Sequence, residues 1–180
     1  MKEIRLHNDN NFNIDYVIRR RTKDDCKSIA HIVTVSWNET YKGIVPDEEL
    51  KALNENETQR AMNSYNDFDE NDNNQFVLEI ENSVVGFVNF GATDDKDFIN
   101  CGEIFALYIL PEYKGRGYGK RLVEEAKKEL KRLGFDKMII SCLKGNPSND
   151  FYKHIGGAYI KDGKYKRLNL DENVYLYENI

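Results

Sequence analysis

The chain has 180 residues, of which 40% are hydrophobic and 32% are charged, and its formal net charge is −5. This length suits one domain with one hydrophobic core. The negative balance argues against broad nucleic-acid binding, which needs a basic face, and no apolar stretch is long enough for a membrane-spanning helix. We therefore expect neither a nucleic-acid partner nor a membrane partner.

The cysteines bear on metal binding and on location. Cys26, Cys101 and Cys142 are widely spaced and odd in number, so they match neither a zinc motif nor a disulfide framework. Their pattern favours buried free thiols in a reducing compartment. The N-terminus lacks the apolar core of a secretory signal. We predict a cytoplasmic protein with no metal ion.

The first predicted elements, in chain order, begin with a polar, Asn-rich segment over residues 1–14 that forms an arm or an added edge strand. Residues 15–180 are expected to form a single domain, which opens with a strand at 16–19. Thr22 and Asp25 make a capping box, and the apolar residues that follow recur at helical spacing.

This first helix is expected to reach Trp37. A second helix begins at Pro46 or Asp47, and the polar residues 63–74 are interpreted as a loop.

The second half of the chain alternates apolar β-prone runs with one long amphipathic segment. The expected elements are strands at 76–80, 84–90 and 102–110, a helix over 117–133, a strand at 138–143, a helix over 147–155, and strands at 158–160 and 174–177. This order predicts an α/β (α+β) fold, with a mixed twisted sheet of about six to seven strands and helices on both faces.

A glycine-rich turn joins the strand at 102–110 to the long helix. Its alternating glycines are Gly115, Gly117 and Gly119, and lysine and arginine side chains surround them. Glycines let the backbone turn tightly and expose its N–H groups, and a helix N-terminus attracts anions. The pattern is neither a Walker loop nor a dinucleotide fingerprint. We favour a pyrophosphate site over a purely structural turn.

These residues also carry a family resemblance. The turn resembles the coenzyme-A-binding motif of the GNAT superfamily of N-acetyltransferases, in which Gln or Arg is followed by x-x-Gly-x-Gly or Ala. Lys114 stands at the Gln/Arg position and keeps the charge, but not the planar fork, of arginine. Residues 37–46 are similar to the family's W-x-x-T-Y-x-G-I-x-P stretch, and residues 146–157 to its N-P-x-x-x-F-Y-x-x-x-G-G segment. The resemblance covers nearly the whole chain after residue 15.

The resemblance implies where acetyl-CoA binds. The sheet should splay between its fourth and fifth predicted strands and hold the coenzyme there, with the pantetheine arm paired to the strand backbone at 107–109. The residues that it assigns to coenzyme binding are Leu107, Tyr108, Ile109, Lys114, Gly115, Arg116, Gly117, Tyr118, Gly119, Lys120, Asn146 and Tyr152.

The resemblance also implies roles in catalysis. Glu103 matches a general base of some members, and a carboxylate in an apolar strand should have a raised pKa; a solvated strand-end glutamate is the alternative. Tyr152 matches a general acid placed near the coenzyme sulfur, and a plain core aromatic is its alternative. Trp37 and Tyr41 are expected to pack the acceptor pocket, although Trp37 fits the core equally well, and Glu39 either orients a cationic amine or is simply solvated.

The implied function is acetyl transfer from acetyl-CoA to a primary amine by direct attack in a ternary complex. The acidic balance leans towards a small amine or polyamine as the acceptor. Three rivals stay open: a protein N-terminal or lysine acetyltransferase, a non-catalytic CoA-binding sensor, and a nucleotide-binding module. A homodimer is one option for the oligomeric state, because dimers are common in the superfamily.

Overall fold

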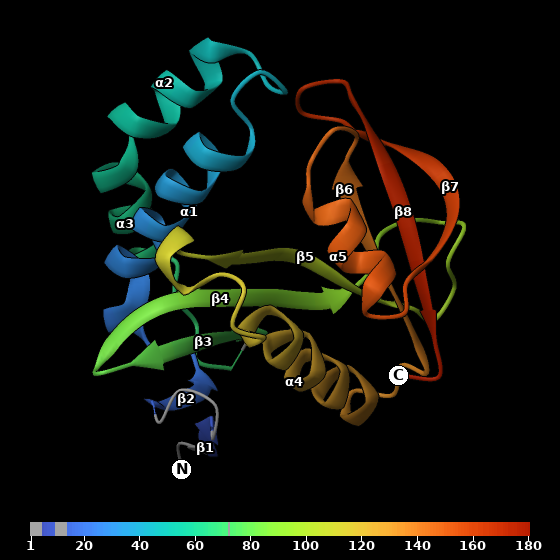
Figure 1. Cartoon of the computed structure of the whole chain (residues 1–180), viewed down its shortest axis with the longest axis horizontal. Coiled ribbons are helices and arrows are strands. Elements are labelled where there is room, and N and C mark those ends of the chain that lie inside the picture. Colours follow the sequence, from blue (N-terminus) through green and yellow to red (C-terminus); the bar gives the residue numbers. More distant parts are fainter. Residues whose placement is uncertain (1–4, 10–13, 72) are drawn as a thin grey trace.

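A computed structural model describes residues 5–9, 14–71 and 73–180. Its strands form one mixed sheet in the order β1-β2-β3-β4-β5-β6-β8-β7 (Figure 1). The strands are β1 (Arg5–Asp9), β2 (Ile14–Arg20), β3 (Gln75–Ile80), β4 (Ser83–Ala92), β5 (Gly102–Ile109), β6 (Lys137–Leu143), β7 (Ala158–Tyr165) and β8 (Leu170–Glu178). Only β5 and β6 pair in parallel among them; the other neighbours are antiparallel.

Helices cover both faces of this sheet, as the sequence predicts (Figure 1). They are α1 (Cys26–Thr40), α2 (Asp47–Glu55), α3 (Glu57–Asn66), α4 (Tyr118–Arg132) and α5 (Ser148–His154). The apolar stripe of α4, including Leu122 and Leu130, packs with Ile104 of β5 in the larger core cluster. On α1, Ile29 and Ile32 pack with the sheet in a second cluster. The two helices thus bury opposite faces of the sheet.

The N-terminal segment extends the sheet. Residues 5–9 form β1, which pairs antiparallel with β2 at one edge of the sheet. Residues 1–4 and 10–13 of the predicted arm lie outside the described residues. The α/β class is confirmed, and β1 brings the described strands to eight.

The predicted loop over 63–74 begins too early, because α3 continues to Asn66. This helix has no buried residue, so hydrophobic periodicity could not reveal it. Polar contacts attach it instead: Arg60 donates to the Thr34 hydroxyl at 2.6 Å, and Arg21 donates to the Ser64 hydroxyl at 2.5 Å. The last two strands are also longer than predicted, because they form a hairpin whose edge strand is largely solvent-exposed.

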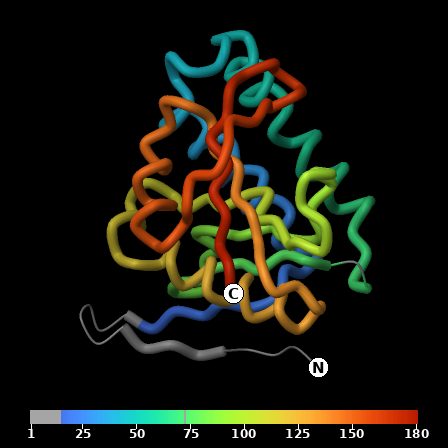
Figure 2. Tube along the Cα trace, turned by 90° about the vertical axis from the view of Figure 1, so that its right-hand side faces the viewer, coloured from blue at the N-terminus to red at the C-terminus, as the bar shows by residue number. Residues whose placement is uncertain are grey.

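The sheet opens between β5 and β6. These strands pair only over 102–104 and 138–140, whereas β5 continues along β4 as far as Ile109. Beyond the pairing with β5, β6 runs on beside β8, and Figure 2 shows β8 descending to the C-terminus. A register shift of β5 against β4 leaves Phe105 as an extra residue just where the splay begins. The edge of β5 that faces away from β4 therefore has no strand beside it over 105–109 within the described chain.

Candidate active site

A groove runs from the splayed edge of β5 to the N-terminus of α4. Its volume is about 740 Å³, which is within the usual range for ligand and cofactor sites. The residues predicted to bind the coenzyme that line it are Leu107, Ile109, Lys114, Gly115, Gly117, Tyr118, Gly119, Lys120, Asn146 and Tyr152. Ten of the twelve residues assigned to the coenzyme thus lie on one surface, whereas Tyr108 and Arg116 do not line this groove.

The glycine turn has the geometry that only glycine adopts easily. Gly115 and Gly117 have φ of 75° and 82°, in the left-handed region that glycine adopts without steric cost. Gly117 is the N-cap of α4, so the partial positive charge of this helix end points at the groove. A Cβ at Gly119 would lie 3.2 Å from the Phe151 ring, across the groove. The missing side chains keep the groove open for an anionic ligand.

The cationic side chains of the turn differ in the groups that they contact. Lys114, at the groove wall, forms an ion pair with Glu39 at the end of α1. Arg116 donates to the Glu112 carbonyl at 3.0 Å and lies over the Tyr113 ring, and the exposed Lys120 lines the groove.

The structure also places Tyr118 and Glu39 at this end of the site. The Tyr118 ring lies in the core, 1% exposed and 5.2 Å from the Tyr16 ring, so the backbone is the part of Tyr118 suited to an anion. Glu39 lines the wall of this groove.

A second cavity continues from the groove into the splay, where Leu107, Ile109 and Tyr152 line both spaces. Its other walls come from β5, β6 and the end of α1, and include Ser36, Thr40, Tyr41, Tyr108, Ser141, Cys142 and Asn146. Burial holds the pKa of Tyr152 well above its ordinary value and raises the pKa of Cys142 to about 12. Both groups therefore stay protonated at neutral pH, so Tyr152 keeps its proton and Cys142 is a poor nucleophile.

Asn146 fixes the end of the cavity beside α5. Its Oδ1 accepts from the Ser148 backbone at 2.8 Å, and its Nδ2 donates to the Tyr41 hydroxyl at 3.3 Å. Asn149, which the sequence analysis did not single out, anchors the same helix, because its Oδ1 accepts from the Tyr175 hydroxyl at 2.9 Å. These buried amides hold Tyr152 at the junction of the two cavities.

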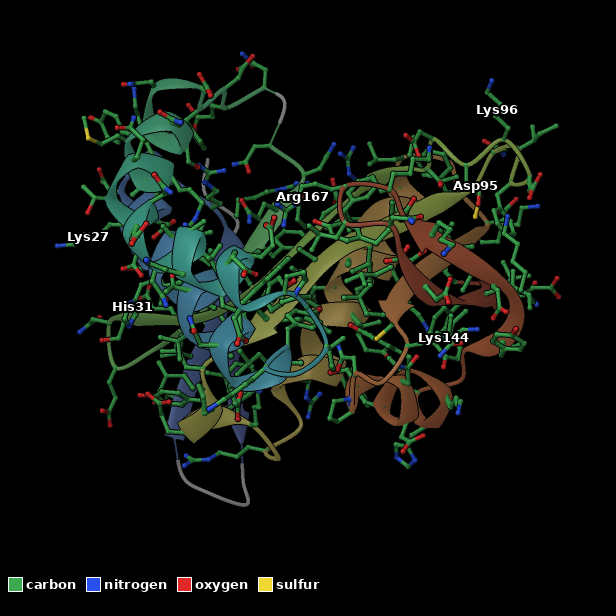
Figure 3. All side chains as sticks on the ribbon, turned by 90° about the horizontal axis from the view of Figure 1, so that it is seen from above. Lys27, His31, Asp95, Lys96, Lys144 and Arg167 are labelled. Carbon is green, nitrogen blue, oxygen red and sulfur yellow. The ribbon has the colours of Figure 1, made fainter. Side chains whose placement is uncertain are left out.

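Trp37 and Tyr41 occupy different positions relative to the cavity. Tyr41 lines it, whereas Trp37 packs edge-on against Tyr41 with ring centroids 4.8 Å apart and donates to the Tyr108 hydroxyl at 3.0 Å. Arg167, which is labelled in Figure 3, comes from the turn between β7 and β8. It lies over the Trp37 ring and pairs with Glu49 at 2.6 Å. The turn and the end of α1 thus close this side of the site together.

Comparisons with known proteins agree with this geometry. Residues 24–156 match the model of the acetyltransferase (GNAT) family. The uncharacterized N-acetyltransferase YuaI of Bacillus subtilis is 31% identical over 137 residues, which cover 76% of each chain. The chain belongs to the GNAT acetyltransferase family. It is therefore an acetyl-CoA-dependent N-acetyltransferase.

Two further relatives come from Thermoplasma acidophilum. A spermidine N(1)-acetyltransferase is 26% identical to this acetyltransferase over 69% of this chain and 74% of its own. A PaiA N-acetyltransferase solved in complex with coenzyme A shares the fold, with a TM-score of 0.71, 21% identity, and coverage of 91% and 98%. No helix in the described parts of the chain is long and apolar enough to cross a membrane, and no described group of three or more His, Cys, Asp or Glu residues could hold a metal ion.

Glu103, the predicted base, lies at the start of β5 of this acetyltransferase. Gly102 faces Leu130 of α4, so Glu103 points to the opposite face, which α1 covers. Burial raises the pKa of Glu103, while the Thr93 hydroxyl, which donates to it at 2.6 Å, lowers the pKa in part. Glu103 is outside the lining of the two cavities, yet Ser141, on the same sheet face, lines the splay cavity.

A second carboxyl on this face was missed by the sequence analysis. Glu172 of β8 pairs with Leu143 of β6, which lies on the same side of the sheet as Ser141. Burial, with a smaller contribution from the charge of Glu103, raises the pKa of Glu172 to about 7. The face of the sheet to which Glu172 points can be told only once the register of β8 against β6 is known. The α1 face thus carries two half-buried carboxyls on either side of Ser141.

Proposed function

We propose that this acetyltransferase modifies a small primary amine that carries a second positive charge, such as a diamine or polyamine. The observation that carries the proposal is the pair of half-buried carboxyls, Glu103 and Glu172, on the face of the sheet away from α4. When burial removes carboxyls from water, a bound cation stabilises their ionised form. The relative named a spermidine N(1)-acetyltransferase supports the same acceptor class.

In this proposal the reaction is a direct attack in a ternary complex. The amine nitrogen forms a bond to the thioester carbon, the carbon–sulfur bond breaks, and CoA leaves as a thiolate. Glu103 takes the proton from the amine, directly or through water, and Tyr152 gives a proton to the sulfur. The high pKa of Cys142 argues against an acetyl-cysteine intermediate at the splay.

The binding parts of the proposal follow the groove. The pantetheine arm pairs with the free edge of β5 at 107–109, Asn146 contacts it, and the pyrophosphate sits on the turn at 114–120. For the pyrophosphate to recruit Lys114, its ion pair with Glu39 must open or be shared. A cytoplasmic location and a homodimer stay predictions.

Free-thiol release from acetyl-CoA with a panel of acceptors tests the acceptor class. The panel holds butylamine, 1,4-diaminobutane, spermidine, and peptides with either a free N-terminus or an internal lysine. We expect the highest kcat/KM with 1,4-diaminobutane or spermidine. A peptide as the best substrate would favour a protein acetyltransferase, and CoA binding without thiol release from any acceptor would favour a sensor.

A further inference from the structure

The buried face of α1 contains a hydroxyl, that of Ser36, that contacts no polar partner in the described part of the chain. Ile29, Ile32 and Val33 pack on the sheet, and Ser36 follows on the same face of the helix. Lys27 and His31 mark the opposite, outer side of α1, where they point away from the sheet (Figure 3). Ser36 is 1% exposed, and its Oγ has no hydrogen-bond partner among the residues that the structure describes.

The same helix shows how a structural hydroxyl is normally satisfied. Thr34, two residues earlier, is also buried, and its hydroxyl donates to the Ala30 carbonyl at 2.9 Å and accepts from Arg60 at 2.6 Å. A serine inside a helix usually bonds back to the preceding turn or points to solvent. Ser36 does neither. A buried polar group left without a partner destabilises a fold, so such a group calls for an explanation.

The position of Ser36 offers an explanation for its unpartnered hydroxyl. Ser36 lines the splay cavity on the side where α1 crosses β5, together with Ala106 and Tyr108. Tyr152, which also lines the coenzyme groove, belongs to the same cavity lining. A thioester carried by the proposed coenzyme must reach this cavity to meet an amine from the α1 face. The acetyl oxygen would then lie between α1 and the free edge of β5.

The reaction creates a need for a hydrogen-bond donor there. When the amine attacks, the carbonyl π electrons move to the acetyl oxygen, and the resulting oxyanion is stabilised by preorganised donors. The Tyr41 hydroxyl is already engaged, because it accepts from Asn146 at 3.3 Å and also bonds with the Tyr108 side chain, whereas the Ser36 hydroxyl has no partner among the described residues. We propose that Ser36 is a catalytic residue whose hydroxyl donates to the acetyl oxygen as it becomes an oxyanion, an inference that rests on the proposed amine acetylation.

Two alanine substitutions on one helix test this role. Ser36→Ala removes an unengaged hydroxyl, so its unfolding temperature should match or exceed that of the wild type. Its kcat should fall about a hundredfold or more, the scale seen for loss of one oxyanion donor. Affinity for CoA, which lacks the acetyl oxygen, and KM for the amine should change little. Thr34→Ala, the matched control, should lower the unfolding temperature and leave kcat near that of the wild type.

Each result that departs from this expectation leads to a different conclusion. A folded Ser36→Ala protein with wild-type kcat would overturn the role of Ser36, and a loss confined to the amine KM would assign Ser36 to the amine instead. If Ser36→Ala is poorly folded, Ser36→Cys, which keeps the shape but donates weakly, must show the same fall in kcat. Absence of transfer by the wild type to every amine would overturn the proposed function together with this inference.

Discussion

The Glu172→Gln substitution gives a quantitative test of the acceptor site. Glutamine keeps the size of Glu172 and its capacity for hydrogen bonds but removes the negative charge. Because burial raises the pKa of Glu172 to about 7, the carboxyl changes its charge within the range in which the enzyme can be assayed. The charge of Glu172 should therefore appear as a pH-dependent preference for acceptors with a second ammonium group.

The size of this preference follows from the pKa. For a pKa of about 7, the ionised fraction rises from about one-tenth at pH 6 to about nine-tenths at pH 8. The second ammonium of a diamine stays protonated throughout this range. The preference of the wild type for a diamine over a monoamine should therefore rise with pH by up to about ninefold, in proportion to the ionised fraction. Glu172→Gln should show a weak preference that does not depend on pH.

The assay compares kcat/KM for 1,4-diaminobutane with kcat/KM for butylamine at each pH. The attacking nitrogen of both acceptors must lose a proton. The ratio of the two kcat/KM values therefore removes most of the pH dependence due to that step and to Glu103. Glu178→Gln, at the exposed end of the same strand, makes the same change in net charge and should behave as the wild type. A diamine preference that is flat with pH in the wild type and unchanged in Glu172→Gln would refute the reasoning.

The same substitution has a signature in stability. The raised pKa means that the native state keeps its proton at pH values where the unfolded chain has lost it. Stability therefore falls as pH rises from the ordinary glutamate pKa of about 4.5 through about 7. Glutamine lacks this dependence. The unfolding temperature of Glu172→Gln should thus gain on that of the wild type as pH rises, while a constant difference across this window would contradict the raised pKa.

Four further predictions concern the coenzyme and the proton transfers. Acetyl-CoA at about a hundred times its Kd should stabilise the fold by about 2.7 kcal/mol in a thermal-unfolding assay, and ATP should do far less; an equal effect of ATP would favour a nucleotide-binding module. Gly119→Val should fold but lose CoA affinity in calorimetry, because its Cβ would lie 3.2 Å from the Phe151 ring and its methyl groups would narrow the groove. Unchanged affinity would make the turn purely structural. Tyr152→Phe should keep CoA affinity and lose turnover by about a hundredfold, and near-normal turnover would reduce Tyr152 to a packing residue. Glu103→Gln should lose turnover most at neutral pH, where only about one part in a thousand of an alkylamine is unprotonated, and less at high pH; superimposed pH profiles would exclude Glu103 as the base.

Much of the fold was predictable because its signals are local. The stripe that includes Leu122 and Leu130 repeats at helical spacing, and the buried strand β6 is an almost unbroken apolar run. Gly115 and Gly117 mark a turn by their composition alone, and their positive φ angles are consistent with that interpretation. In contrast, α3 has no buried residue and is attached by polar contacts such as Arg60 to Thr34, which leave no periodic apolar pattern.

Only the part of the candidate site whose residues are close together in the sequence could be predicted. The residues of the turn and of β5 are close in sequence, so their shared groove follows from one motif. Glu172 could not be found this way, because its nearness to Ser141 depends on the register of β8 against β6. Ser36 is equally hidden, since a missing hydrogen-bond partner is a property of the packed structure.

A crystal structure of the chain with acetyl-CoA tests the central claim most directly. We expect the pantetheine arm along the free edge of β5 at 107–109, the pyrophosphate on the turn at 114–120, and the acetyl group in the splay cavity. The acetyl oxygen should lie within hydrogen-bond distance of the Ser36 hydroxyl, and the sulfur should lie beside Tyr152. A coenzyme bound outside the splay between β5 and β6, or an acetyl group that reaches neither Ser36 nor Tyr152, would contradict the account.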